Sequence, residues 1–245
     1  MKPKSSITLD NNSPTHYTGT DLLEVFLNAT NYNNNIVRLT KTALKSDDHL
    51  LDFGAGIGNF SVLFKELGYQ VETAEQDPVL AQRLVNLGFT NHIELSSVRN
   101  ASVDSVYSFN VLEHIEDDVD MCKQLHTKLR DGGTLILYLP ALSWLFSELD
   151  RKVGHFRRYH RTGIINVLES SGFTVTQCQY VDSLGVPIGI IFKYFGHRDG
   201  SVSKWQVQVF DKIVFPMSKF LDNFFMYVGG KNLFVVAHKI SGPLP

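Results

Sequence analysis

Cysteine is scarce in this chain of 245 residues. Cys122 and Cys178 are its only cysteines, and they lie far apart in the sequence. Because they do not form a C-x-x-C pair, the sequence offers neither a zinc-binding nor a dithiol redox motif. A domain stabilised by disulfides would carry more cysteines, so we expect two buried thiols in a protein of the reducing cytoplasm.

The chain also lacks an excess of charge of either sign. Lys and Arg number 23 against 25 Asp and Glu, which gives a formal net charge of −2 at pH 7. Domains that bind DNA or RNA usually carry a strongly basic field. We therefore expect no nucleic-acid partner, and any contact with an anionic surface must be local.

A long apolar run is missing as well. Residues 1–14 carry positive charge without the apolar region of a signal peptide. The most apolar stretch, residues 186–196, is interrupted by Pro187, Gly189 and Lys193. It is shorter than the roughly 20 residues that a transmembrane helix needs. These features predict a soluble, cytoplasmic protein.

From residue 49 onward, short apolar runs alternate with helical segments, a pattern typical of an α/β fold with a parallel sheet. Helices are predicted at residues 21–29, 36–44 and 117–129, with the polar residues 31–35 as a connection between the first two. The apolar runs predict seven strands, at His49–Phe53, Gln70–Ala74, Ile93–Leu95, Ser105–Phe109, Thr134–Leu139, Thr174–Tyr180 and Leu233–His238.

We expect one structural domain with four parts. A helical lead-in or lid covers residues 1–46, and an α/β core covers residues 47–181. A helical insertion at residues 182–231 precedes the last strand and tail, residues 232–245. In the insertion, apolar residues recur at helical spacing, and Pro216 should kink or divide the helix.

The sequence LLDFGAGIGNF, residues 50–60, predicts a buried strand, a glycine-rich turn and a helix. Gly54, Gly56 and Gly58 allow a ligand to approach the backbone closely at the carboxyl end of the strand. Asn59 occupies the place of the third glycine in the dinucleotide fingerprint G-x-G-x-x-G, which disfavours NAD. We expect a different cofactor at this turn.

Glu75 stands at the end of the next predicted strand. A carboxylate at that place can accept hydrogen bonds from both hydroxyls of a ribose. The glycine turn and Glu75 together therefore predict a cofactor that contains a nucleoside.

Four segments, LLDFGAGIGNF, VETAEQDP, SVYSFNVLEHIEDD and LRDGGTLILYLP, follow one another between residues 50 and 140. With them, the chain resembles the class I S-adenosylmethionine-dependent methyltransferases of the small-molecule type. The segments NYNNNIVRLTKTAL and GHFRRYHR are similar to one branch of that family. The resemblance implies a Rossmann-like seven-stranded sheet of order 3-2-1-4-5-7-6 with an antiparallel last strand. It also implies S-adenosylmethionine as cofactor and S-adenosylhomocysteine as product.

The resemblance also implies roles for particular residues. The glycines line the methionine and ribose portion, Glu75 holds the ribose hydroxyls and Gln76 flanks the adenine. Asn110 and Val111 face the sulfonium, and Tyr32 closes over the cofactor. The segment Leu95–Asn100 lacks the acidic residue that the family often places near the adenine. The predicted cofactor contacts are Tyr32, Asp52, Gly54, Gly56, Gly58, Glu75, Gln76, Asn110 and Val111.

Methyl transfer is an in-line displacement in which the protein mainly positions the reactants and excludes water. A base is needed only for an oxygen acceptor or a protonated amine. His114, His155 and Tyr159 are the titratable candidates at the expected mouth of the pocket, and we predict that they are catalytic.

Asn110, Glu113 and His114 have the spacing i, i+3 and i+4. Some O-methyltransferases are similar in this region but bind a divalent metal through E-x-x-E-H. Here Asn110 replaces the first carboxylate, which weakens a site for a hard cation. We therefore assign no metal, and the alternative roles are a helix cap for Glu113 and a pocket wall for His114.

The charged segment DRKVGHFRRYHR, residues 150–161, allows two interpretations. Arg157 and Arg158 can clamp an anionic substrate, or they can pair with Asp150 and its neighbours in a solvated connector. The insertion also leaves two choices. It is either a helical cap buried on the domain, or an apolar acceptor tunnel or shallow membrane contact with Lys204, Lys212 and Lys219 at its rim.

The sequence predicts transfer of a methyl group to a small-molecule or lipid-linked acceptor. Nucleic-acid bases are disfavoured as acceptors, because residues 110–113 read NVLE where base-amine methyltransferases resemble one another in D/N-P-P-F/Y. The alternative function is a catalytically silent protein that binds the cofactor, or a partner protein, on the same fold. A monomer and a homodimer are both compatible with the sequence.

Overall fold

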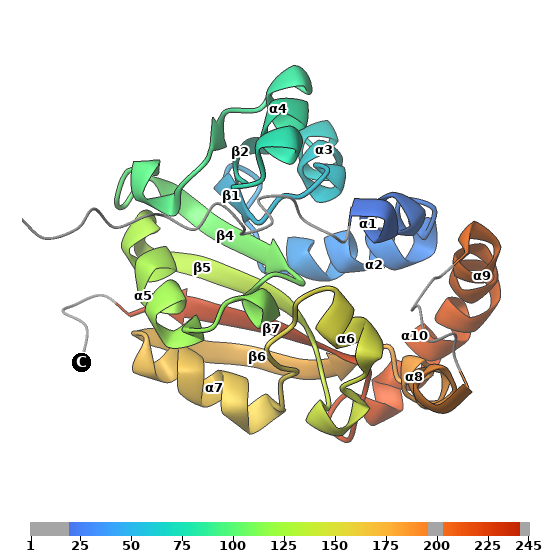
Figure 1. Ribbon diagram of the computed structural model, residues 1–245. Helices are drawn as coiled ribbons and strands as arrows, with labels where there is room; N and C mark the ends of the chain where they lie inside the picture. The colour runs from blue at the N-terminus through green and yellow to red at the C-terminus, as the bar shows by residue number, and fades with distance from the viewer. Residues whose placement is uncertain (1–19, 196–202, 241–245) are drawn as a thin grey trace, which may run out of the picture.

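A computed structural model describes residues 20–195 and 203–240 and contains one seven-stranded sheet (Figure 1). The strand order is β3-β2-β1-β4-β5-β7-β6, and β7 is antiparallel to both of its neighbours. The predicted order and the antiparallel last strand are therefore confirmed. The strands are β1 (His49–Phe53), β2 (Gln70–Ala74), β3 (Asn91–His92), β4 (Val103–Phe109), β5 (Leu129–Pro140), β6 (Phe173–Val181) and β7 (Asn232–Lys239).

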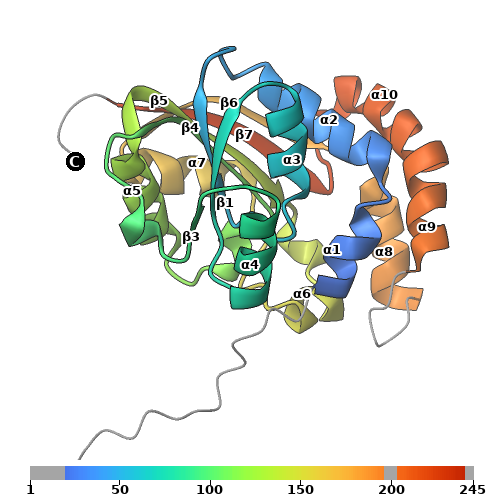
Figure 2. The ribbon, with the colours of Figure 1, turned by 90° about the horizontal axis from the view of Figure 1, so that it is seen from above.

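Helices cover both faces of the sheet (Figure 2). On one face, Ile36 of α2 and Phe64 of α3 pack against Leu50 and Tyr107 of the sheet. On the other face, Leu125 of α5 and Leu168 of α7 join a second apolar cluster. The helices are α1 (Thr20–Phe26), α2 (Thr30–Lys41), α3 (Asn59–Glu66), α4 (Pro78–Asn86), α5 (Asp118–Lys128), α6 (Glu148–Lys152), α7 (Arg161–Ser170), α8 (Gly185–Phe195), α9 (Lys204–Val209) and α10 (Phe215–Phe225).

The third strand was placed wrongly from the sequence. We expected residues 93–95, but β3 is Asn91–His92, and Leu95 begins the short 3-10 helix η1 (Leu95–Ser97). The side chain of Leu95 is buried in the core through this turn rather than through a strand. A two-residue strand at the edge of a sheet leaves few unpaired backbone groups for another chain.

The lead-in also differs from the expectation, because residues 31–35 are helical rather than a connection. Ala29 at the N-cap of α2 has no side-chain hydrogen bond to the helix. Instead, the buried carboxylate of Asp211 accepts hydrogen bonds from the backbone N–H groups of Asn31 and Tyr32 at 3.0 and 2.8 Å. The first N–H groups of a helix need such partners, and a carboxylate there also suits the helix dipole. A residue of the insertion therefore starts a helix of the lead-in.

The insertion forms α8, α9 and α10, which lie together beyond one end of the sheet (Figure 2). We expected Pro216 to kink or divide the segment. The segment is divided at that point, because the π-helical turn η4 (Phe210–Val214) separates α9 from α10 and Pro216 lies in the first turn of α10. Proline has no N–H to donate to the preceding turn, and the wider turn accommodates its ring. Within residues 20–195 and 203–240, no helix combines the length and the apolar character needed to cross a bilayer.

We predict that Asp211→Ala lowers the free energy of unfolding by about 1–3 kcal/mol, because it leaves two partly buried N–H groups in the first turn of α2 without their acceptor. Urea unfolding followed by far-UV circular dichroism measures this change. The control is Asp47→Ala, at an exposed loop position, which should shift stability by no more than about 0.5 kcal/mol. Equal stability of the two variants would contradict the capping role.

Candidate functional site

The glycine turn follows β1 and leads into α3. Gly54, Gly56 and Gly58 all have left-handed backbone angles, with φ of 76°, 55° and 83°. A Cβ at Gly54 would lie 2.4 Å from a methyl group of Val111, so glycine is required there by packing as well as by conformation. The turn therefore offers bare backbone at the carboxyl end of the first strand.

Glu75 holds the turn in place from the end of β2. Its Oε2 accepts a hydrogen bond from the N–H of Gly56 at 2.8 Å, and its Oε1 accepts one from the N–H of Asp77 at 2.9 Å. Each carboxylate oxygen can accept a second hydrogen bond. Glu75 can therefore brace the turn and still receive two ribose hydroxyls. Gln76, next to it, is exposed.

Asp52 lies beneath the turn rather than on its open side. Its Oδ2 accepts hydrogen bonds from the hydroxyls of Ser61 and Tyr107 at 2.5 and 3.0 Å. Burial raises the pKa of Asp52 to about 7, against the opposing effect of these two hydrogen bonds. Asp52, which we predicted to contact the cofactor, is thus a buried residue whose hydrogen bonds connect β1 to α3 and β4.

Helix α1 lies over the glycine turn. A Cβ at Gly56 would meet a methyl group of Leu23 at 3.2 Å. Glu24 of the same helix forms an exposed ion pair of 3.6 Å with Arg83 of α4. The part of the predicted lid that is described, from residue 20 onward, therefore lies where a ligand would contact the turn. Residues 1–19 lie outside the described chain.

The chain turns sharply at the end of β4. Asn110 is exposed and has a φ of 55°, a conformation that asparagine adopts more readily than most residues. Its N–H donates to the carbonyl oxygen of Tyr138 on β5. The turn directs Val111 against Gly54 and starts the 3-10 helix η2 (Leu112–His114).

Two of the predicted catalytic residues lie side by side beyond β4. The rings of His114 and His155 meet edge to face, with 4.6 Å between their centroids. Burial, together with the neighbouring His155, lowers the pKa of His114 to about 4, so its imidazole is neutral at pH 7. The adjacent Glu113 is fully buried, and burial raises the pKa of its carboxyl to about 8.

Tyr159 is not at the mouth of the site. Its ring is part of the apolar core, and its hydroxyl donates to Asp118 at 2.9 Å and to the carbonyl of Leu112 at 3.3 Å. Burial and the charge of Asp118 hold the pKa of this hydroxyl well above its usual value. Its surroundings fit a structural residue and not the predicted catalytic one.

The two arginines of the predicted substrate clamp are engaged within the chain. Arg158 donates to both carboxylate oxygens of Asp150, at 2.9 and 3.0 Å. Arg157 pairs with Asp118 at 2.6 Å and donates to the carbonyl of Glu116. Arg158 therefore forms a bidentate pair, but its partner is a carboxylate of the same chain and not a substrate. This is the pairing that the connector interpretation expects. The internal role of Asp150 was recognisable from the sequence S-E-L-D at residues 147–150. This spacing is typical of a capping box, and Ser147 and Asp150 form one at the start of α6.

Tyr32 lies in an aromatic cluster at the far side of the same edge. Its ring contacts those of Tyr138, Phe210 and Phe215, with centroids 5.9, 6.5 and 5.2 Å away. Asn232 at the start of β7 donates to its hydroxyl at 3.4 Å. Burial and the nearby Asp182 raise the pKa of Tyr32 well above its usual value. The predicted closure over a cofactor would need this ring to leave its neighbours.

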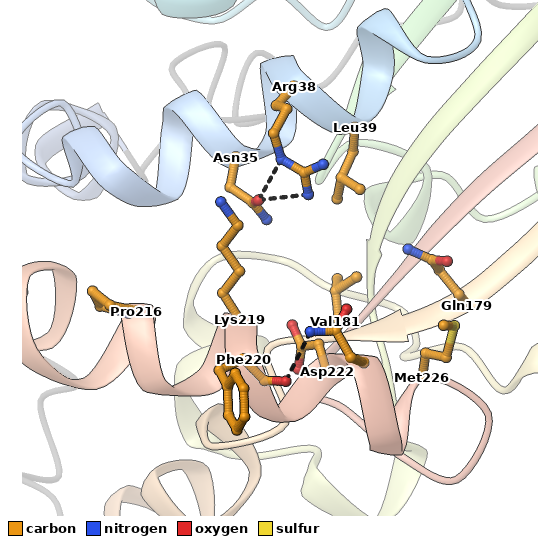
Figure 3. A pocket seen from close by; sticks show the side chains of 11 residues that line it. Asn35, Arg38, Leu39, Gln179, Val181, Pro216, Lys219, Phe220, Asp222 and Met226 are labelled. Atoms are coloured by element: carbon orange, nitrogen blue, oxygen red, sulfur yellow. Dashed lines mark hydrogen bonds between the residues drawn. The ribbon is translucent and has the colours of Figure 1, made fainter.

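A cavity of about 450 Å³ lies between α2 and α10 beside the end of β6 (Figure 3). Asn35 and Arg38 line it from α2, and Lys219 and Asp222 line it from α10. Arg38 is held by the side chain of Asn35, and Asp222 accepts hydrogen bonds from the backbone of residues 182 and 183. None of the predicted site residues lines this cavity, so it is separate from the glycine turn.

Comparison with known proteins gives matches to methyltransferases. The sequence model of a methyltransferase domain matches residues 28–178, more than half of the chain. A probable S-adenosylmethionine-dependent methyltransferase of Mycolicibacterium smegmatis is 26% identical over 168 residues. That alignment covers 65% of this chain and 63% of the relative, so it spans less than two thirds of the relative's length.

Solved structures of low sequence identity share the fold. A SAM-dependent methyltransferase of Thermotoga maritima, described as a possible histamine N-methyltransferase, has a TM-score of 0.61 at 15% identity over 91% of this chain and 96% of its own. An N-methyltransferase of Haemonchus contortus in complex with S-adenosylhomocysteine has a TM-score of 0.55 at 17% identity, over 85% of this chain and 53% of its own.

We predict that Glu75→Ala weakens binding of S-adenosylhomocysteine about tenfold to a hundredfold, because it removes a charged hydrogen-bond acceptor and releases the N–H of Gly56. Isothermal titration calorimetry measures the affinity. Gly56→Val should abolish binding, since valine is strained at a φ of 55°. The exposed Glu66→Ala at the end of α3 is the control, and an unchanged affinity in Glu75→Ala would overturn the cofactor site.

We also predict a pH-dependent stability that comes from Asp52. Its pKa is about 7 in the folded chain against an ordinary value of 3.8, so folding takes up a proton between these pH values. The free energy of unfolding should therefore fall as the pH rises through this window. Denaturant unfolding of Asp52→Asn at several pH values should show a shallower slope than the wild type. Parallel pH curves for the two proteins would contradict the assignment.

Proposed function

The chain belongs to the S-adenosylmethionine-dependent methyltransferases, and we propose that it transfers a methyl group from this cofactor to a small-molecule or lipid-linked acceptor. The observation that carries the proposal is the glycine turn braced by Glu75. Bare backbone next to a carboxylate with spare acceptor capacity fits a nucleoside cofactor. The fully buried polar groups around the turn are satisfied from within, which keeps the turn in this shape.

The residues have distinct expected roles in this function. When bound, S-adenosylmethionine supplies both the methyl group and the leaving group. Gly54, Gly56 and Gly58 would hold it through their backbone, and Glu75 would bind its ribose. Helix α1 would exclude water from above the turn.

A stripe of exposed apolar side chains on α9, η4 and α10 supports a lipid-linked acceptor. Trp205, Phe220 and Phe224 are 69%, 65% and 68% exposed, which is unusual for large aromatic residues. Ile213, Met217, Phe220 and Phe224 recur every three or four residues, as on one face of a helix, and the last two members follow α10. The stripe consists of Trp205, Ile213, Met217, Phe220, Phe224, Tyr227 and Val228.

The opposite side of the same segment faces the domain. Val207, Asp211, Phe215 and Ser218 are buried, and they too recur at helical spacing. The stripe is therefore not the core-facing side of a buried cap. Lys204, Lys212 and Lys219 are exposed, and each directly precedes a member of the stripe. An apolar face with lysines at its border is suited to the interface of an anionic membrane.

The test is transfer of labelled methyl from S-adenosylmethionine by the full chain into a host-cell extract, which is then separated into organic, aqueous and precipitable fractions. We predict label in the organic fraction. Phe220→Ser with Phe224→Ser should reduce this labelling about tenfold or more, because two large apolar side chains no longer enter the lipid.

The matched control is Val79→Ser with Val85→Ser, which removes two exposed apolar side chains from α4 and should leave the labelling unchanged. Label in the aqueous fraction alone would contradict a lipid-linked acceptor and favour a free small molecule. Binding of S-adenosylhomocysteine without label in any fraction would contradict methyl transfer and favour the silent cofactor-binding protein.

A further inference from the structure

Three side chains with metal-binding atoms meet beyond the end of β4. Glu113 and His114 belong to η2, and His155 comes from the loop after α6. One ligand atom of each residue lies within 4.8 Å of those of the other two. We propose that Glu113, His114 and His155 bind a divalent transition-metal cation.

The strongest indication is the carboxylate of Glu113. The residue is fully buried, and neither of its side-chain oxygens has a hydrogen-bond partner among the described residues. Nε2 of His155 is 3.8 Å from Oε1, which is too far for a hydrogen bond. A buried carboxyl group normally has a hydrogen-bond partner, and its ionised form needs a donor or a cation beside it. A cation between Glu113 and the two imidazoles would supply that compensation.

His155 is oriented for this role. Its Nδ1 lies 2.8 Å from Oδ1 of Asp150, which leaves Nε2 directed toward Glu113. Asp150 is itself fixed by Arg158 and by Ser147. Histidines that bind metals commonly donate their second ring nitrogen to a carboxylate in this way. Asp150 would therefore not bind the cation itself but would orient the imidazole of His155 toward it.

The two segments that carry the ligands are joined through their backbones. The N–H of Phe156 donates to the carbonyl oxygen of Glu113 at 2.8 Å, and the N–H of His155 donates to that of Asp150 at 2.8 Å. Gly154 also lies against the ring of His114, since a Cβ at this glycine would be 3.9 Å from Nδ1. The three side chains are thus held near one another before any ion binds, which lowers the cost of assembling the site.

The ligand set indicates the kind of cation. Two imidazoles and one carboxylate suit Zn²⁺, Fe²⁺, Co²⁺ or Mn²⁺, whereas Mg²⁺ and Ca²⁺ prefer oxygen ligands. Along the sequence, Asn110 stands where the E-x-x-E-H pattern has its first carboxylate, before Glu113 and His114. The structure replaces the missing first carboxylate with His155, which lies far along the chain.

A second group of His, Glu and His residues shows the contrast. Glu72 directs one oxygen to His49 at 3.0 Å and the other to His92 at 2.7 Å. The oxygen that faces His92 is therefore already hydrogen-bonded to an imidazole, unlike either oxygen of Glu113. The two groups have the same composition, so a variant of the second group is a matched control for the first.

The test is titration of Zn²⁺ into the full chain after dialysis against a chelator, followed by calorimetry. We expect one high-affinity Zn²⁺ per chain, and at least about tenfold weaker binding in Glu113→Gln and in His155→Gln. His92→Gln should bind Zn²⁺ as tightly as the wild type. Mg²⁺ should bind far more weakly than Zn²⁺.

A spectroscopic measurement on the wild type alone tests the site even if a variant fails to fold. Co²⁺ bound by the wild type should give visible absorption bands of a site with nitrogen and oxygen ligands, and Zn²⁺ should remove them. Equal Zn²⁺ affinity in wild type and His155→Gln, absence of the Co²⁺ bands, or Mg²⁺ binding as tight as that of Zn²⁺ would each overturn the proposal. Because no acceptor or methyl transfer enters these measurements, their failure is separate from that of the proposed function.

Discussion

The site depends on one constraint, which is that neighbouring strands of the sheet end at the same edge and the chain must turn away sharply from each of them. The turn after β1 uses glycines, but those after β4, β5 and β6 use Asn110, Leu142 and Asp182, all with left-handed backbone angles. Asparagine and aspartate adopt such angles more readily than other residues with a side chain, so the angle is most costly at Leu142. The side chain of Leu142 is buried, and its packing in the core stabilises the turn after β5.

Buried carboxylates hold the loops that follow these turns. Asp150 fixes the segment after α6 through Arg158, and Asp118 fixes it again through Arg157 and Tyr159. In each case the carboxylate has partners that satisfy it, so its burial stabilises a single arrangement of the loop. Glu113 lies among these groups and differs from them, because its oxygens have no hydrogen-bond partner among the described residues. This difference distinguishes Glu113, which we propose as a cation ligand, from Asp150 and Asp118, which stabilise the loop.

Local patterns in the sequence predicted most of the sheet. Apolar runs mark the strands well because burial on both faces of a parallel sheet requires them. The errors arise where a partner is remote. Residues 31–35 read as a polar connection, yet they are helical because Asp211 caps them. The sequence left two roles open for Arg157 and Arg158, because the pairing of Arg157 with Asp118 depends on the fold. β3 was misplaced because Leu95 is buried through a turn, which has the same composition as a short strand.

The candidate site was predicted in part for the same reason. The glycine turn and Glu75 are recognisable because each follows a strand directly, and their contact follows from the parallel pairing of β1 with β2. The joining of Glu113 and His114 to His155 could not be read from the sequence, since it requires the loop after α6 to fold back onto η2.

The lead-in and the insertion act as one unit at the edge of the site. Asp211 of η4 binds the first turn of α2, and the ring of Tyr32 in that turn packs between Phe215 of α10 and Tyr138 of β5. The residues that bury this unit, such as Phe215, alternate with the exposed apolar stripe on the same helices. A surface that engaged the stripe would therefore contact helices whose inner faces pack against the first turn of α2.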